Sequence, residues 1–130
     1  MATTTASTTD PIEWALVAAR AADAKGGTNS VVLDVGEVLA ITGAFVITSA
    51  ANSRLVKALV NEIEAKIVEA GGPKPRRMEG LDKLEWVLID YGDFVVHVFA
   101  EEQRGFYELE RLWSDVPRVA WADEPAVAEA

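Results

Sequence analysis

The sequence predicts one mixed α/β domain, of the α+β kind, in which helices flank a small mixed β-sheet. Apolar residues recur at helical spacing in three segments, and β-branched or alternating runs lie between them. The elements follow in the order helix, strand, strand, helix, strand, strand, helix, which is typical of helices packed on a sheet. A chain of 130 residues buries about two-thirds of its unfolded surface. We therefore expect a single domain, residues 10–116, that needs no disulfide.

The first helix has clear start and stop signals. Residues 1–9 are small and polar and predict a disordered arm. Asp10 is then the expected N-cap, Pro11 the first helical residue and Glu13 the acidic residue three positions after the cap. Gly26 and Gly27 end the helix near Lys25. Two alternative inward faces fit the spacing: Ile12, Leu16, Ala19 and Asp23, or Ala15, Ala18 and Ala22.

Two strands and the longest helix follow. Residues 31–35 and 44–48 are β-branched runs that predict strands, whereas residues 36–42 are ambiguous and allow one helical turn. Asn52 or Ser53 caps a helix that continues to about Ala70 and ends at Gly71-Gly72-Pro73. Its apolar stripe is Leu55, Val56, Leu59, Val60, Ile63 and Ile67, and Glu62 and Lys66 are spaced for an ion pair. The basic connection 74–78 leads to a short edge strand.

The tract WVLIDYGDFVVHVFAEEQRGFYELERLW, Trp86 to Trp113, reads as strand, tight turn, strand and helix. With Tyr91 and Gly92 as the loop, Ile89 pairs with Phe94 and Trp86 with His97. Side chains alternate across a strand, so the two faces of this hairpin differ. One face carries Trp86, Leu88, Val95, His97 and Phe99; the other carries Val87, Ile89, Phe94, Val96 and Val98. The second face is apolar throughout, and we expect helices to cover it.

The last helix opens at residues 101–104, and Phe106, Leu109, Leu112 and Trp113 line one side of it. Pro117 marks its end. Residues 117–130 have the composition of a flexible tail, within which Val119 and Trp121 are candidates for local packing.

Composition excludes several function classes. The chain has no cysteine, which excludes disulfides, thiolate metal sites and cysteine nucleophiles. No apolar run reaches the roughly 20 residues that span a bilayer, and no signal peptide is visible, so we expect a soluble, cytoplasmic protein. The net charge of −9 disfavours nucleic acid as the main partner. Solubility explains that charge most simply, and the alternative is a basic protein partner.

The sequence does not predict a catalytic, cofactor or metal site. Asp90 and Asp93 flank a turn, where carboxylates hydrogen-bond the local backbone, and Asp34 lies on another strand. A nucleotidyltransferase would need converging carboxylates for Mg²⁺ and a Gly-Ser turn, and the sequence contains no Gly-Ser dipeptide. His97 is the only histidine. It has no nucleophile or second ligand at a suggestive spacing, so a packing role or an interface role remains for it.

The segment LDVGEVLAITGAFVITSAANSR, Leu33 to Arg54, then Glu79-Gly80 and the Trp86 to Trp113 tract resemble the RsfS or Iojap family of ribosomal silencing factors. Gly43-Ala44 and Ala50 depart from the pattern usual in that family. The resemblance implies a nucleotidyltransferase-like topology without the catalytic motif. It also implies docking on the large ribosomal subunit through ribosomal protein L fourteen, which sterically blocks the small subunit when nutrients are scarce.

Trp86 can be a core residue or an interface residue on its own pattern, and the resemblance favours the interface. We therefore predict a partner-binding surface made of Trp86, Leu88, Asp90, Val95, His97, Phe99, Glu101, Glu102, Arg104 and Tyr107. The same apolar face is costly to expose, so a homodimer of the free protein is a further hypothesis. The competing hypotheses are a nucleotidyltransferase-fold enzyme or nucleotide-binding protein, and a generic α/β dimerisation module.

Overall fold

The computed structural model describes residues 11–35, 43–102, 104 and 118–121, which form a mixed sheet covered on one face by helices. The predicted α+β class is therefore confirmed. The elements are α1 (Pro11–Ala24), β1 (Thr28–Asp34), β2 (Ala44–Ala50), α2 (Ser53–Glu69), β3 (Arg77–Glu79), β4 (Trp86–Asp90), β5 (Phe94–Ala100) and β6 (Arg118–Val119).

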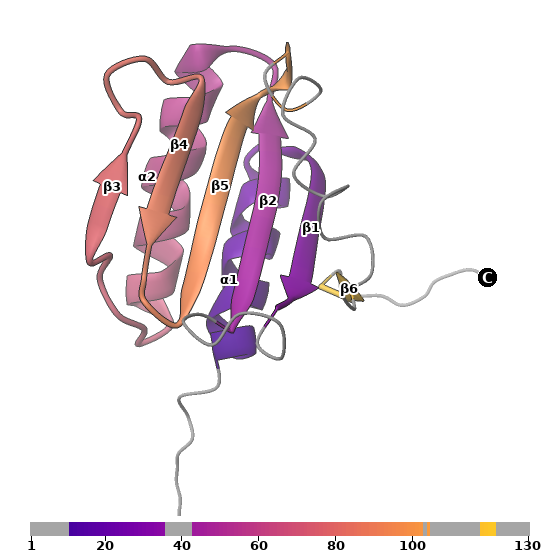
Figure 1. Cartoon of the computed structure of the whole chain (residues 1–130), viewed down its shortest axis with the longest axis vertical. Helices are drawn as coiled ribbons and strands as arrows, with labels where there is room; N and C mark the ends of the chain where they lie inside the picture. The colour runs from indigo at the N-terminus through magenta and orange to yellow at the C-terminus, as the bar shows by residue number, and fades with distance from the viewer. Residues whose placement is uncertain (1–10, 36–42, 103, 105–117, 122–130) are drawn as a thin grey trace, which may run out of the picture.

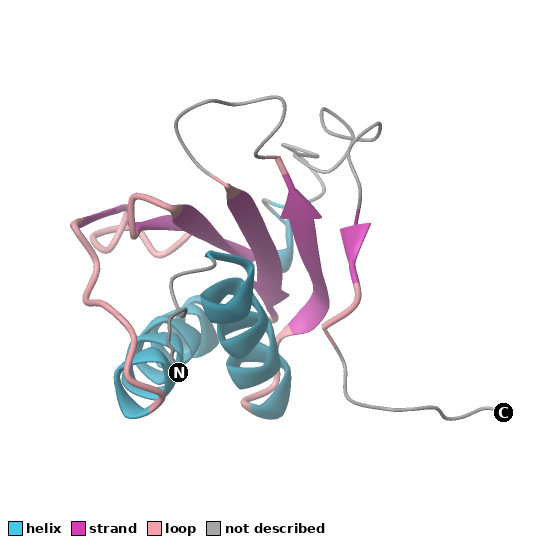
Figure 2. Cartoon of the chain, turned by 90° about the horizontal axis from the view of Figure 1, so that it is seen from below, coloured by secondary structure: helices cyan, strands magenta, loops and turns pink. Residues whose placement is uncertain are grey.

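The sheet has the strand order β3-β4-β5-β2-β1-β6 (Figure 1). Neighbouring strands are antiparallel except for the central pair β2 and β5, which run parallel. Such a parallel pair needs a long crossover, which α2 supplies on the same side as α1. Figure 2 shows both helices beneath one face of the sheet. Among the described helices, none is long and apolar enough to cross a membrane.

The helices pack through the stripes that their sequences predict. In α1 the alanine-rich face, Ala15, Ala18 and Ala22, is inaccessible; of the other predicted face, Ala19 is also buried, Ile12 and Leu16 pack partly on the core, and Asp23 is exposed. Small side chains let α1 lie close to both α2 and the sheet. Asn52 caps α2 by accepting a hydrogen bond from the Leu55 N–H at 2.9 Å. The buried side of α2 is Val56, Leu59, Val60, Ile63 and Ile67. Lys66 pairs with Glu69 at 3.5 Å rather than with the expected Glu62.

The hairpin between β4 and β5 has the predicted faces but a different register. Trp86 lies opposite Phe99, and His97 lies opposite Leu88, so the expected Trp86–His97 and Ile89–Phe94 pairings are wrong by two residues. The Tyr91 N–H donates to the Phe94 carbonyl, so Gly92 and Asp93 form the loop. Gly92 has φ +88°, which suits the first central position of a type II′ turn. Shifting by two preserves the alternation, and the faces therefore remain as expected.

Residues 118–121, which follow the predicted domain, contact β1. Strand β6 pairs with β1, and Trp121 donates its indole N–H to the Ser30 carbonyl at 2.8 Å. Val119 and Trp121 both pack on the main core, as their apolar character indicated. The predictions for residues 1–10, for 36–42 and for most of the last helix lie outside the described residues.

Candidate functional site

The sheet face opposite α1 and α2 carries most of the predicted partner-binding residues. We call it the aromatic face; its residues are Phe45, Trp86, Leu88, Asp90, Val95, His97 and Phe99. They come from the three neighbouring strands β2, β5 and β4, which places them side by side. Phe45, Trp86, Leu88 and Val95 are half-buried, whereas Phe99 and His97 are buried. The face therefore presents apolar side chains around an inner pair of rings.

The rings of the aromatic face form one contiguous group. Trp86 stacks on Phe99 with ring centroids 4.9 Å apart and planes at 27°. His97 lies beside Trp86, with centroids 6.0 Å apart, and makes an edge contact with Phe45 at 5.0 Å. A smaller apolar cluster that includes Leu33 and Ile47 supports these rings from β1 and β2. Edge-to-face and offset-stacked contacts of this kind fix ring orientations as well as burying area.

A hydrogen bond links Trp86 to His97. The Trp86 indole Nε1–H donates to His97 Nδ1 at 3.1 Å. An indole nitrogen is only a donor, so Nδ1 is the unprotonated nitrogen and the neutral imidazole carries its hydrogen on Nε2. Within the described part of the chain, His97 Nε2 is buried without a hydrogen-bond partner. Burial disfavours the charged form and lowers the pKa of His97 to about 4.

Asp90 is engaged within the fold. Its Oδ1 accepts the Gly92 N–H at 2.8 Å, which confirms the turn role expected of this carboxylate. Its Oδ2 lies 3.4 Å from Arg77 Nε, across the pairing of β3 with β4. The edge of the aromatic face at β3 is therefore an ion-paired rim around an apolar centre.

Residues at the start of the predicted last helix make hydrogen bonds to the first residue of β1, Thr28, and to Ser49 near the end of β2. Arg104 Nη1 donates to the Thr28 carbonyl and to Ser49 Oγ, both at 3.2 Å. Arg104 is only 7% exposed, so these contacts hold its guanidinium within the fold of the free protein. Glu101 accepts the Thr28 hydroxyl at 3.0 Å and, like Glu102, remains exposed. Tyr107 lies outside the described residues.

The carboxylates considered for a metal do not converge. Asp34 follows Val32 and Leu33 in β1, and alternation directs it to the helix side, whereas Asp90 belongs to the aromatic face. Among the described residues there is no group of three side chains that fits a metal ion.

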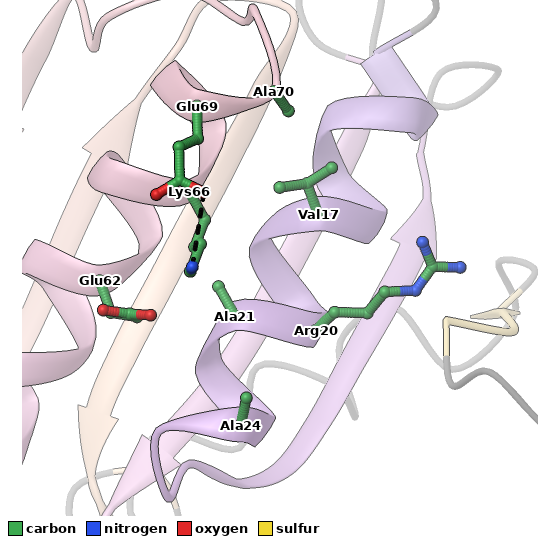
Figure 3. Close-up of a pocket in the computed structure, with 8 residues that line it drawn as sticks. All are labelled: Val17, Arg20, Ala21, Ala24, Glu62, Lys66, Glu69 and Ala70. Carbon is green, nitrogen blue, oxygen red and sulfur yellow. Dashed lines mark ion pairs between the residues drawn. The ribbon is translucent and has the colours of Figure 1, made fainter.

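A shallow pocket of about 350 Å³ lies between α1 and α2, in the helix layer (Figure 3). Val17, Ala21 and Ala24 give it an apolar floor, and the Lys66–Glu69 ion pair borders it. It lies on the helix side of the sheet, away from the aromatic face.

Sequence reasoning missed Phe45 as a member of the site. The residue lies in β2, parallel to β5, where it sits opposite Val95 and next to His97. The sequence predicts a strand that contains Phe45. It does not predict that this strand lies beside β5, because the β2–β5 pairing joins segments about fifty residues apart.

The sequence and the fold of this chain are similar to those of one protein family. Residues 8–130 match the family described as ribosomal silencing factor during starvation. The ribosomal silencing factor RsfS of Bacillus subtilis is 38% identical over 101 residues, which are 78% of this chain and 85% of the relative. The mouse protein named mitochondrial assembly of ribosomal large subunit protein 1 is 32% identical over 85 residues, 64% of this chain and 37% of that protein.

Solved structures agree with the sequence relatives. A Chromobacterium violaceum protein superposes with a TM-score of 0.75 at 30% identity, covering 93% of this chain and 94% of that one. A Bacillus halodurans protein gives a TM-score of 0.71 at 34% identity, with coverage of 84% and 98%. The family match over nearly the whole chain, together with relatives that share its fold, shows that this chain belongs to the ribosomal silencing factors.

Proposed function

We propose that the protein is a non-catalytic repressor of translation that docks on the large ribosomal subunit through the aromatic face. Bound there, it blocks joining of the small subunit when nutrients are limited. Membership of the silencing-factor family supports this function. The observation that carries the choice of surface is the half-buried Trp86, held in a defined orientation on the sheet face that α1 and α2 leave uncovered.

The chemistry of the aromatic face suits a protein partner. Half-buried aromatic and aliphatic side chains surrounded by polar residues form the usual anatomy of an interface, with an apolar centre and a charged rim. Trp is strongly enriched among residues whose truncation costs most of the binding energy. On this face, Phe45, Leu88 and Val95 extend the apolar area around Trp86.

The rim indicates a basic partner. Glu85, Glu101 and Glu102 are exposed at the ends of the strands that make the aromatic face, and the chain as a whole carries −9. Complementary charge speeds association and rejects wrong partners. The family resemblance implies ribosomal protein L fourteen, and we propose it as the docking partner. We expect binding to weaken as salt rises, because exposed charges are screened.

Blocking requires no chemistry in this proposal. The sheet and its two helices form one packed body, and a body bound at the subunit-joining surface excludes the other subunit by its volume. No transition state is stabilised and no cofactor takes part.

Sedimentation with purified bacterial large subunits tests the docking surface. We expect the wild-type protein to co-sediment and Trp86→Ala to bind at least ~30-fold more weakly, since truncating a central indole often costs ~2 kcal/mol or more. Val68→Ala is the matched control, because Val68 is 50% exposed on α2 and lies in the helix layer. Equal binding by Trp86→Ala and wild type would refute the surface assignment. Failure of the wild type to bind would refute the function itself.

Subunit joining tests the repression step. Adding the small subunit to large subunits preloaded with wild-type protein is expected to yield few complete ribosomes, whereas preloading with Trp86→Ala is expected to leave joining intact. Normal joining on saturated large subunits would contradict the steric mechanism.

The enzymatic alternative and the proposed homodimer can each be tested by a direct measurement. Mg²⁺-dependent nucleotide binding in calorimetry would support the enzymatic alternative. The free protein is also proposed to form a homodimer that covers part of the aromatic face, and light scattering that gives a strict monomer at micromolar concentration would count against this.

A further inference from the structure

We propose that His97 is a positioning residue for the docking surface: it accepts the indole N–H of Trp86 and thereby aligns that ring over Phe99. This inference rests on the proposed function for its consequence in binding. The internal arrangement that it describes concerns the free protein.

Among the described residues, a stacked ring and a hydrogen bond contact the indole at different points. The strand register places Trp86 directly opposite Phe99, and its ring stacks there at 4.9 Å. Stacking alone allows the ring to slide or to turn over, since it has little directional preference in the ring plane. The hydrogen bond from Nε1 to His97 Nδ1 at 3.1 Å fixes which edge of the ring points along β5. The pyrrole edge is thereby directed to His97.

The imidazole itself lies among aromatic rings of β2 and β5. Phe45 contacts its edge at 5.0 Å with planes at 78°, and the ring of Phe99 lies parallel to it within 15°. His97 is only 5% exposed, so it has little freedom to follow a moving indole. An acceptor that is fixed in this way can set the orientation of a half-buried donor.

A polar ring at this position is costly for folding alone. His97 Nε2 is buried without a hydrogen-bond partner among the described residues, and an unsatisfied buried polar group opposes folding. An aliphatic side chain would avoid that cost among the rings of the aromatic face. The acceptor at Nδ1 is what an aliphatic side chain cannot supply, and alignment of Trp86 accounts for its presence.

The hydrogen bond from the indole N–H to His97 restricts which groups of a partner protein can contact Trp86. Because Nε1–H is already bonded to His97, a partner that meets Trp86 meets the carbon surface of its ring rather than this donor. A methyl-bearing side chain or the hydrocarbon stem of a lysine or arginine fits that surface, and a cation can then meet the π face or the acidic rim. A partner carbonyl directed at the indole N–H does not fit.

Two variants of His97 distinguish its role in aligning Trp86 from its role in packing. In His97→Asn the Oδ1 atom occupies the place of Nδ1 and can accept the same hydrogen bond, whereas His97→Leu has a similar shape and no acceptor. We expect His97→Leu to bind large subunits about fivefold more weakly than wild type, the equivalent of one lost hydrogen bond, and His97→Asn to stay within about twofold. Equal binding by the two variants, or tighter binding by His97→Leu, would overturn the proposal.

The free protein provides a readout that packing alone would not move. In a ¹⁵N-labelled sample the indole N–H resonance of Trp86, assigned by its loss in Trp86→Phe, is expected downfield and slow to exchange in wild type and His97→Asn. In His97→Leu it is expected upfield and exchanging faster. An unchanged resonance in His97→Leu would refute the hydrogen bond whatever the binding result.

The two proposals fail in different ways. If Trp86→Ala binds the large subunit as well as wild type does, the docking surface is wrong, while the indole resonance still tests the alignment. Thermal unfolding completes the comparison, because buried leucine is expected to tolerate this site at least as well as asparagine. Weaker binding by a more stable His97→Leu therefore points to alignment and not to damage of the fold.

Discussion

Acidification is expected to destabilise the protein through His97. The unfolded imidazole has a pKa of about 6.5, and burial lowers the folded value to about 4. Between these two values the unfolded chain binds a proton that the folded chain excludes, so the unfolding free energy falls as pH decreases. A tenfold change in proton affinity is worth about 1.4 kcal/mol, so the full difference corresponds to about 3.5 kcal/mol, of which about 3 kcal/mol is reached at pH 4. The loss begins near pH 6.5 and is complete below pH 4.

Urea unfolding at pH 8, 6.5, 5 and 4 measures this effect when wild type is compared with His97→Leu. The carboxylates titrate in both proteins, so their contribution cancels in the difference. We expect the stability of His97→Leu relative to wild type to rise by about 3 kcal/mol from pH 8 to pH 4. A difference that is independent of pH would refute the assignment of a buried neutral imidazole.

Three further predictions concern the surrounding fold. Arg104→Lys is expected to lower the unfolding free energy by about 1–3 kcal/mol in urea, because the lysine Nζ ends one atom short of the Nη1 that donates to Thr28 and Ser49; unchanged stability with lost subunit binding would show an outward contact instead. Asn52→Ala is expected to cost about 1 kcal/mol by removing the cap of α2, and Asn52→Ser to restore it, without effect on subunit binding. Gly80→Ala is expected to be more destabilising than Gly71→Ala. Both glycines have φ near +90°, but only at Gly80 would the added methyl group collide with the Trp86 carbonyl oxygen; equal losses in thermal unfolding would contradict that account.

The two faces of the hairpin were predictable because alternation is a local property. Val87 and Ile89 are buried under the helices, and Trp86 and Leu88 lie on the opposite face, as the sequence indicated. The register was not predictable to the residue, because Gly92 can occupy either central position of a two-residue turn that needs positive φ.

Long-range pairings limit what the sequence alone predicts of the site. Phe45 reaches His97 only because β2 runs parallel to β5, and no local pattern specifies which strands become neighbours. Arg104 lies in a polar segment that predicts an exposed helix start. Its guanidinium is nevertheless buried, where it donates hydrogen bonds to the Thr28 carbonyl and to Ser49 Oγ. Both contacts join segments that are separated by at least fifty positions in the chain.

The distribution of apolar residues between the two sheet faces makes docking separable from folding. The larger core lies on the helix side, where α1 and α2 pack on Val46, Val96 and their neighbours. The smaller cluster on the aromatic face includes Phe99 at full burial, but Trp86 is only packed against its edge. Truncating Trp86 therefore removes a half-buried ring without opening the larger core, which is the condition under which a loss of subunit binding reports on the interface itself.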